Sequence, residues 1–421
     1  MQFIDGGVTA PLGFTANGIL NHIKASRKTP DTALIYSDTP CTAAGVFTQN
    51  RVKAECVKLT KAHIADGRAQ AVIANSGNAN ACTGAQGYAN AEKTAAAVAA
   101  ALGVKAEDVL VCSTGVIGQQ LPVEKITDNL KTLADGLSKQ GHETARQAIM
   151  TTDTQYKECA VKTTVGGKTV TLGTMAKGSG MIHINLGTML GFITTDCAIR
   201  GDMLQKALAE SAAATYNCVS VDGDTSTNDT LLVLANGKAG NAEITAPGED
   251  YDAFLAALNA LNTQMAKKIA ADGEGATRLI TCTVTGADTV ADARGLAKAV
   301  ICSNLVKAAF FGRDANWGRI LDAMGYSGFE FTPEKTSVSF VSRAGAKRYF
   351  ADGEANGGEE RRIKVFDNGV PLDFDEEKAK AILSEEAVDI LVELGDGSAT
   401  GTAWGCDLTY DYVKINGDYR T

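Results

Sequence analysis

Short apolar runs alternate along the chain with longer segments in which apolar residues recur every three or four positions. The short runs are rich in β-branched residues and predict strands. They are TALIYS at 32–37, QAVIAN at 70–75, DVLVCS at 108–113, LGFITTD at 190–196, TLLVLA at 230–235, RLITCTV at 278–284 and TSVSFV at 336–341. The segment ECAVKTTVGGKTVTLG predicts a hairpin, because Gly166 and Gly167 can supply the positive φ angles of a tight turn.

The longer segments predict helices with one buried face. Between Asp252 and Ala271 the apolar residues recur at steps of three and four. Similar patterns lie at 88–102, 122–137, 201–215, 289–310 and 375–394. Strands mixed with helices predict an α/β (α+β) fold of layered sheets and helices. The sequence contains no internal repeat, low-complexity tract or Pro-rich linker that would mark a domain boundary.

Composition and charge narrow the class of function. The 421 residues are 45% hydrophobic and 21% charged, which is typical of a globular protein with a sizeable core. The net charge of −9 disfavours nucleic acid and anionic membrane as partners, because both bind basic patches. The start, MQFIDGGVTAPLGF, lacks the features of a signal peptide. We therefore expect a cytoplasmic protein that acts on small molecules.

The ten cysteines are scattered singly, without a C-x-x-C pair or a Cys/His cluster. This spacing indicates neither a zinc site nor a disulfide framework. Several cysteines lie inside apolar runs, as Cys112 does in DVLVCS. We expect buried free thiols in a reducing compartment.

Several familiar motifs fail on inspection. GGKT at 166–169 resembles the end of a P-loop but lacks the first glycine. The run DGDTSTND from Asp222 has part of the oxygen spacing of a calcium loop, but Thr227 replaces the glycine and Val233 the bidentate glutamate. His183 could serve as an acid or base, although a structural, hydrogen-bonded histidine is the favoured interpretation. The sequence therefore predicts no metal site.

The informative segment is MAKGSGMIHINLGTMLGFITTD, from Met175 to Asp196. Gly187 can take strained backbone angles, and the hydroxyl of Thr188 can attack the carbonyl that precedes it. Hydrolysis of the resulting ester would leave Thr188 with a free α-amine. Such an amine has a pKa of ~8 and can act as general base for its own hydroxyl. A catalytic histidine is then unnecessary.

This segment resembles the cleavage and nucleophile motif of the ornithine acetyltransferase family, and the similarity extends over essentially the whole chain. The matching strings are GGVTAPLGF at 6–14, NSGNANACTG at 75–84, CSTGVIGQ at 112–119, MTTDT at 150–154, SVDGDTSTNDT at 220–230, GEGATRLI at 273–280, FFGRDANWGRI at 310–320 and the terminal AWGCDLTYDYVKINGDYRT. Two positions depart from the family pattern. Gly187 stands where the family usually has alanine, and Ile184 where it commonly has proline. Neither change removes a reacting group.

The resemblance implies roles for individual residues. Thr188 is the self-processing residue and the acetyl-accepting nucleophile. Thr114 and Gly115 form the oxyanion hole, in which each donor contributes roughly 3 kcal/mol of transition-state stabilisation. The substrate-contacting positions are Thr151, Lys177, Thr188, Glu274, Asn416 and Thr421. Without the resemblance, STGVIG would be interpreted as a strand-to-helix turn, and Lys177 and Glu274 as solvated surface charges.

The charges of Lys177 and Glu274 suit the substrates that the resemblance implies, N-acetylornithine and glutamate. Lys177 suits the carboxylate of an acetylated amino acid, and Glu274 suits the side-chain ammonium of ornithine. The apolar and aromatic residues near the C-terminus, Tyr410, Tyr412, Val413 and Ile415, favour a docked tail over a disordered one.

The implied reaction is ping-pong transfer of acetyl from N-acetylornithine to glutamate, which yields ornithine and N-acetylglutamate in arginine biosynthesis. An acyl-enzyme conserves the energy of the amide bond, so we expect no metal or cofactor. Some family members also accept acetyl-CoA, and the sequence leaves this open. The alternatives are an amidohydrolase or aminopeptidase of similar architecture, in which water resolves the acyl-enzyme, and a non-enzymatic protein whose chain stays whole.

The resemblance also implies an organisation. Self-cleavage divides the chain into an α fragment, 1–187, and a β fragment, 188–421, which remain associated as one catalytic unit. The expected architecture is that of self-processing N-terminal-nucleophile enzymes, with sheets sandwiched between helices. The expected assembly is a heterotetramer of two α and two β fragments.

Overall fold

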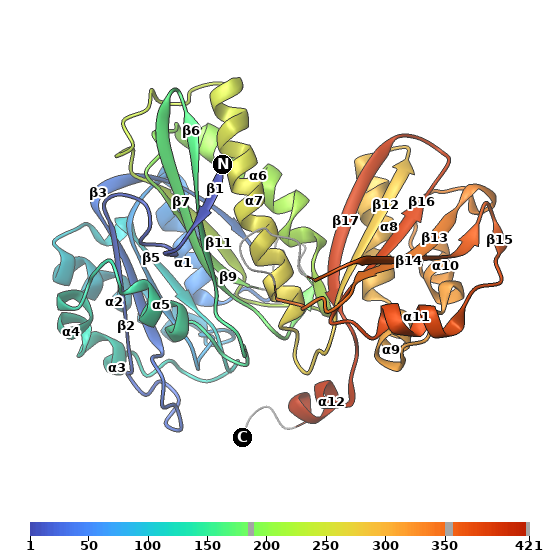
Figure 1. Cartoon of the computed structure of the whole chain (residues 1–421). Helices are drawn as coiled ribbons and strands as arrows, with labels where there is room; N and C mark the ends of the chain where they lie inside the picture. Colours follow the sequence, from blue (N-terminus) through green and yellow to red (C-terminus); the bar gives the residue numbers. More distant parts are fainter. Residues whose placement is uncertain (184–188, 350–356, 418–421) are drawn as a thin grey trace. The chain divides into compact units, whose positions relative to one another are not determined.

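The computed structural model describes residues 1–183, 189–349 and 357–417. The chain divides into two compact units, each with its own sheet and helices (Figure 1). The first contains the described residues of 1–178, 184–217 and 224–265, and the second contains 179–183, 218–223 and the described residues of 266–421. Each unit therefore combines segments from both sides of the 187–188 bond.

The first unit is built on a nine-stranded sheet with the order β1-β6-β7-β9-β11-β3-β4-β5, and β2 also pairs with β3. Its strands are β1 (Gln2–Ile4), β2 (Phe14–Ile19), β3 (Thr32–Phe47), β4 (Arg68–Asn75), β5 (Val109–Ser113), β6 (Lys157–Val165), β7 (Lys168–Lys177), β9 (Leu190–Thr195) and β11 (Thr230–Ala235). The β4–β5 and β9–β11 pairs are parallel. The two strands that follow the 187–188 bond, β9 and β11, lie in the middle of the sheet, between β7 and β3.

Helices cover both faces of this sheet. They are α1 (Glu55–His63), α2 (Gly84–Leu102), α3 (Val123–Thr127), α4 (Leu130–Asp135), α5 (His142–Ala148), α6 (Gly201–Ala214) and α7 (Glu249–Ala271). Along β3, Ile35 points into a core shared with α5, whereas Leu34 points into a second core shared with α1 to α4. The strands are therefore apolar on both faces, which explains why they form continuous apolar runs in the sequence. Helices α6 and α7 lie side by side, and the Tyr251 hydroxyl donates to Glu210 (Figure 1).

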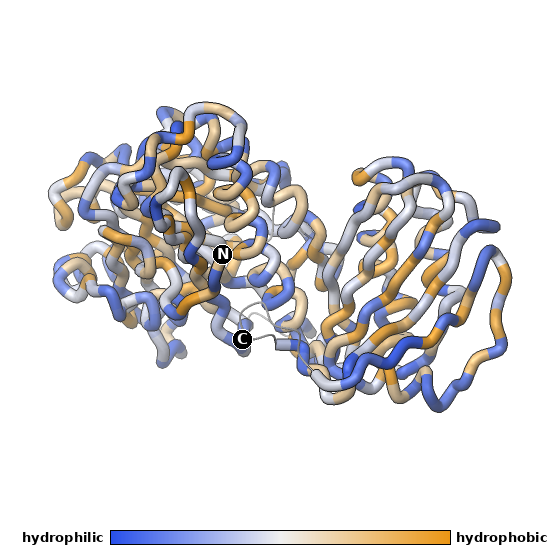
Figure 2. Tube along the Cα trace, turned by 45° about the horizontal axis from the view of Figure 1, so that its top comes forward, coloured by the Kyte–Doolittle hydropathy of each residue, from blue (hydrophilic) through white to orange (hydrophobic). Residues whose placement is uncertain are grey.

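The second unit holds a six-stranded sheet with the order β15-β14-β13-β16-β12-β17. Its strands are β12 (Leu279–Ala287), β13 (Ser337–Arg343), β14 (Glu360–Asp367), β15 (Val370–Pro371), β16 (Ala387–Glu393) and β17 (Ala399–Cys406). Its helices are α8 (Val290–Cys302), α9 (Asn304–Gly312), α10 (Trp317–Gly325), α11 (Glu376–Leu383) and α12 (Tyr410–Asn416). Helix α8 packs against β12 and β17, and a separate ladder joins β8 (Ile182–His183) to β10 (Ser220–Thr225). In both units the hydrophobic residues follow the strands, and the connecting loops are mostly hydrophilic (Figure 2).

The predicted fold class and strands are confirmed, and each predicted run lies within or overlaps an observed strand. The hairpin is also confirmed, with φ of 55° at Gly166 and 72° at Gly167. Two helical predictions are correct only in part. The segment 122–137 forms the two short helices α3 and α4, and 289–310 is interrupted at Ser303, whose side chain accepts the N–H of Val306 and begins a new helix.

The helix predicted over 375–394 is wrong in its second half. Helix α11 ends at Leu383, and Ala387–Glu393 is the strand β16. The side chains of β16 alternate between buried and half-buried positions, with Val388, Ile390 and Val392 in the core. A period of two is the signature of a strand, and it was hidden by the helical pattern that precedes it.

All ten cysteines are free thiols, and all except Cys82 and Cys302 are buried, as expected. Among the described residues, no single helix is long and apolar enough to cross a membrane. The pair α8 and α9 meets that criterion only jointly, and the two helices are bent by 59° where they meet.

Candidate active site

Four of the positions named in the sequence analysis lie outside the described residues: Ile184, Gly187, Thr188 and Thr421. The residues that follow Thr188 are described and buried. Met189 accepts the N–H of Thr230 through its carbonyl at 2.9 Å, and Leu190 begins β9 opposite Lys177 of β7. The strand that follows the expected nucleophile is therefore fixed by hydrogen bonds on both sides.

The expected oxyanion-hole residues lie in the turn that follows β5. The N–H of Thr114 donates to the Asn75 carbonyl at 2.9 Å, and the Thr114 side chain is buried. Gly115 has a φ of +133°, and a Cβ at this position would lie 2.5 Å from the Asn78 nitrogen. Only glycine fits here, because both the backbone angle and the neighbouring main chain exclude a side chain. The turn therefore has a fixed shape, as preorganised donors require.

A set of buried amide and hydroxyl groups holds this turn from behind. Ser113 Oγ donates to Asn75 Oδ1 at 2.7 Å. Asn228 Nδ2 donates to the carbonyls of Ser113 at 2.8 Å and Ala79 at 2.6 Å. Three of the strings that carry the family resemblance, at 75–84, 112–119 and 220–230, thus meet around one turn. Asn75 and Asn228 lie within these strings, but sequence reasoning assigned neither of them a positioning role.

Thr151 and Lys177 are both connected to a buried carboxylate, Asp153. Its Oδ2 accepts the N–H of Thr151 at 3.1 Å, and its Oδ1 accepts the N–H of Gly178 at 2.7 Å. Lys157 Nζ contacts the same Oδ1 at 2.7 Å, and both side chains of this pair are fully buried. Burial alone would raise the pKa of Asp153, but the charges of Lys157 and Lys177 and the Gly178 N–H outweigh it and hold the pKa well below its usual value. Asp153 lies within the matched string at 150–154 but was not singled out from the sequence.

Glu274 and Asn416 meet in the second unit. Asn416 Nδ2 donates to Glu274 Oε2 at 2.7 Å, and the Glu274 N–H donates to the Ser179 carbonyl at 3.0 Å. Glu274 is buried, so the interpretation of this residue as a solvated surface charge is wrong. The same holds for Lys177, which is 8% exposed.

The described part of the C-terminal tail, α12, is docked, but by different contacts from those expected. The Thr409 hydroxyl donates to the Gly275 carbonyl at 2.8 Å, next to the Asn416–Glu274 bond. Tyr410 and Val413 are 84% and 69% exposed, so apolar burial does not fix the helix. Tyr410 still makes one aromatic contact, edge-to-face with Phe311, with ring centroids 5.5 Å apart.

His183 has the surroundings of a structural histidine. Its Nδ1 lies 3.2 Å from Ser220 Oγ and 3.6 Å from Cys302 Sγ. Burial, reinforced by the charge of Lys298, lowers the pKa of His183 to about 4. The ring is therefore neutral at pH 7 and ties β8 to its neighbours.

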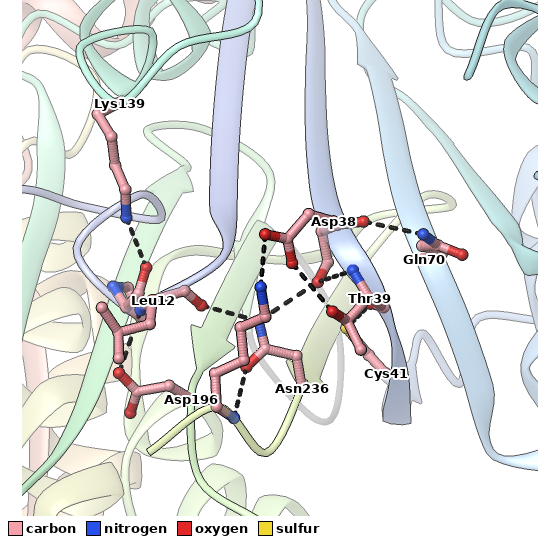
Figure 3. Close-up of polar contacts among 11 residues, drawn as sticks. Leu12, Asp38, Thr39, Cys41, Gln70, Lys139, Asp196 and Asn236 are labelled. Atoms are coloured by element: carbon pink, nitrogen blue, oxygen red, sulfur yellow. Dashed lines mark hydrogen bonds and ion pairs between the residues drawn. The ribbon is translucent and has the colours of Figure 1, made fainter. Parts of the chain in front are cut away.

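The first matched string, 6–14, lies in a polar network at the opposite end of β9 (Figure 3). Asp196, just after β9, accepts the N–H groups of Thr171 at 2.7 Å and Leu12 at 3.1 Å. Lys139 Nζ donates to the Pro11 carbonyl and Asn236 Nδ2 to the Leu12 carbonyl, each at 2.8 Å. This string thus anchors the N-terminal loop to the sheet, at the end remote from Leu190.

Comparisons with known proteins identify a family model and relatives that are similar to this chain. The model of the ArgJ family matches residues 15–421. The arginine biosynthesis bifunctional protein ArgJ of Symbiobacterium thermophilum is 50% identical over 424 residues, and that of Caldanaerobacter subterraneus subsp. tengcongensis is 48% identical over 421 residues, each match covering 100% of both chains. A crystal structure of the arginine biosynthesis bifunctional protein ArgJ of Bacillus halodurans is 44% identical, with a TM-score of 0.48, and covers 55% of this chain and 99% of that one. The chain therefore belongs to the ArgJ family.

Proposed function

We propose that this protein is a self-cleaving acetyltransferase of arginine biosynthesis that moves acetyl from N-acetylornithine to glutamate through Thr188. The observation that carries the proposal is the match over the full chain to relatives named for arginine biosynthesis, at 50% and 48% identity. The buried strand that follows Thr188 and the fixed turn at Thr114 and Gly115 are consistent with it.

Self-cleavage proceeds in two balanced steps. The Thr188 hydroxyl attacks the Gly187 carbonyl carbon, a C–O bond forms, the C–N bond breaks, and the hydroxyl proton passes to the departing nitrogen. Water then hydrolyses the ester, which returns the hydroxyl to Thr188 and gives Gly187 a free carboxylate. The new α-amine, whose usual pKa is about 8, becomes the general base for the Thr188 hydroxyl.

The sheet topology supports an association of the two fragments that outlasts cleavage. Strands β9 and β11 of the second fragment hydrogen-bond to β7 and β3 of the first, in the middle of the first unit's sheet. In the second unit, β8 of the first fragment pairs with β10 of the second. Separation would expose buried strands, so we expect fragments 1–187 and 188–421 to copurify. A heterotetramer of two such pairs is the assembly that we propose.

Transfer then follows a ping-pong course. Thr188 attacks the acetyl carbonyl of N-acetylornithine, the oxyanion receives hydrogen bonds from Thr114 and Gly115, and ornithine leaves with the proton taken from the hydroxyl. The amine of glutamate attacks the acetyl ester in turn and restores Thr188. Lys177 pairs with the α-carboxylate and Glu274 with the ammonium of ornithine. The relatives' names call them bifunctional without stating the second activity, and we propose acetyl-CoA as a second donor. Free thiols support a cytoplasmic location.

Replacement of the nucleophile tests the proposal. On denaturing gels the native protein should give fragments of 187 and 234 residues (421 − 187), and the larger should begin with TMLGF. Thr188→Ala should remain a single inactive chain, while Thr169→Ala, an exposed change on β7, should behave like the native protein. If Thr188→Ala still splits or transfers acetyl, Thr188 is not the nucleophile. Release of free acetate instead of N-acetylglutamate would favour an amidohydrolase.

A further inference from the structure

The segment that precedes the proposed cleavage bond is anchored within the second unit. Ser179 Oγ donates to the Asp272 carbonyl at 2.6 Å, and the Ser179 carbonyl accepts the N–H of Glu274 at 3.0 Å. A Cβ at Gly180 would collide with the Glu274 carboxylate. This segment, residues 179–183, is called the upstream arm below.

Asp222 makes the most specific contact with the upstream arm. Its Oδ2 accepts the N–H of Met181 at 2.6 Å, and its Oδ1 accepts the N–H of Ile182 at 2.8 Å. Both oxygens of one carboxylate are thus aimed at two consecutive main-chain donors, and such charge-assisted bonds are short and strong. Ser220, on the same strand, donates through Oγ to the Ile182 carbonyl at 3.2 Å.

The contact with Asp222 holds an unfavourable backbone conformation. Met181 has a φ of +57°, a left-handed angle that a residue with a side chain rarely adopts, and its side chain is 42% exposed. Burial of the Met181 side chain therefore does little to stabilise this bend. The bend turns the chain at Met181 just before β8, and Asp222 bonds to the main chain on both sides of that turn.

We propose that Asp222 is a positioning residue for self-cleavage, because it fixes the upstream arm, which continues in sequence to the 187–188 bond. This inference rests on the proposed function. In the N→O acyl shift, the Gly187 carbonyl must face the Thr188 hydroxyl before the C–O bond can form and the C–N bond break, and misorientation is costly in rate. On the downstream side of the bond, β9 is held by its pairing with β7; on the upstream side, the arm is held by Asp222.

The test is the rate of cleavage of newly made chains. Native, Asp222→Asn and Asp222→Ala proteins are pulse-labelled in a cell-free translation system, chased, and resolved on denaturing gels. We expect Asp222→Asn to slow cleavage at least about tenfold, because its amide can accept at only one of the two positions, and Asp222→Ala to slow it further. Asp375→Asn is the matched control, because Asp375 also accepts a main-chain N–H in the second unit, at the start of α11. The Asp375→Asn protein should cleave at the native rate.

Two further measurements separate positioning from loss of the fold. Each Asp222 change is combined with Thr188→Ala, so that uncleaved chains are compared, and the melting temperature should stay within a few degrees of that of Thr188→Ala alone. Hydroxylamine, which splits an accumulated ester, should not restore rapid cleavage if the acyl shift is the step that is slowed. Native-rate cleavage in Asp222→Ala, a collapse in melting temperature that accounts for the slowing, or rescue by hydroxylamine would each overturn the proposal. A native chain that never cleaves would overturn the proposed function instead, and the role of Asp222 with it.

Discussion

Asn416 donates a hydrogen bond from Nδ2 to Glu274 Oε2 at 2.7 Å and so joins residues 142 positions apart in the sequence. The donor is a neutral amide, so the bond orients the carboxylate without neutralising it. A carboxylate oriented in this way is suited to pair with an ammonium group. The helix α12 thus acts on the chemistry of Glu274 through one side chain.

Substitution of these two residues should affect recognition of the donor and leave self-cleavage intact. We expect Glu274→Gln to lower kcat/KM for N-acetylornithine by about tenfold to a hundredfold, because loss of a charged hydrogen-bond partner costs about 1.5–3 kcal/mol. Asn416→Ala should lower it by about tenfold or less, since it removes one hydrogen bond. Steady-state kinetics with varied N-acetylornithine measure both.

The double variant sharpens this prediction. Because Asn416 acts by orienting Glu274, the two effects should not add in Glu274→Gln/Asn416→Ala. Lys414→Ala, an exposed change on the same helix, serves as control. Additive effects would show that Asn416 acts independently of Glu274, and an unchanged donor preference in Glu274→Gln would remove Glu274 from the site.

A second prediction concerns the turn at Thr114 and Gly115. Thr114→Val should lower kcat by about 10²–10³, since loss of one oxyanion donor costs about 2.7–4 kcal/mol. Gly115→Ala should abolish transfer and lower the melting temperature, because its Cβ would press on the Asn78 main chain. Gly118→Ala is the matched control: it also has a positive φ, of 83°, but its Cβ would meet open space. Equal melting temperatures for the two alanine variants would contradict the steric argument.

Local sequence patterns predicted most of the strands and the glycine turn of the β6–β7 hairpin. Strands such as β11 are apolar on both faces, so their short β-branched runs stand out from the helical periodicity around them. The failure at 375–394 has a local cause, because Leu383, Ala387 and Leu391 continue the four-residue apolar spacing of a helix across the end of α11. The alternation of Val388, Ile390 and Val392 that marks the strand β16 does not stand out against that helical spacing.

The site was less accessible to sequence reasoning than the fold. The resemblance supplied Thr114, Lys177 and Glu274 directly, but Asp153 and Asp222 act through main-chain N–H groups that any residue could provide. Such partners are set by tertiary packing, and only the structure reveals them. Asp153 and Asp222 nevertheless each lie inside a string that matches the family. The strings therefore marked these residues as part of the resemblance, but residue chemistry alone could not show their roles.

The buried Lys157–Asp153 pair should contribute strongly to stability. Lys157→Met leaves Asp153 buried with one less positive neighbour, and breaking such a pair costs about 3–5 kcal/mol. Lys131→Met is the matched control, because Lys131 and Asp135 have the same four-residue spacing on an exposed surface, where little change is expected. Chemical denaturation of the uncleaved Thr188→Ala background measures both.

The same pair predicts a dependence on acid. The folded-state pKa of Asp153 is depressed, so its contribution is present above the unfolded value of about 3.9 and is lost as the pH falls below it. Asp153→Asn should therefore reduce the loss of the free energy of unfolding that the native residue shows at acid pH. If the free energy of unfolding depends on acid pH in the same way in the variant, Asp153 is not held ionised in the folded chain.

The final prediction concerns His183, whose pKa is lowered to about 4 by burial and the nearby charge of Lys298, against the opposing charge of Asp222. The unfolded chain has a histidine pKa of about 6.5, so between that pH and about 4 the unfolded state binds the extra proton. Stability from this residue is therefore complete above about pH 6.5 and declines as the pH falls toward 4. His183→Asn, compared with the native residue in the Thr188→Ala background, should remove that decline.

Its matched control is His22→Asn, because His22 is exposed and its φ of 55° suits asparagine. If His183→Asn changes the free energy of unfolding by the same amount at pH 7 and at pH 4.5, the ring is not held neutral by the fold.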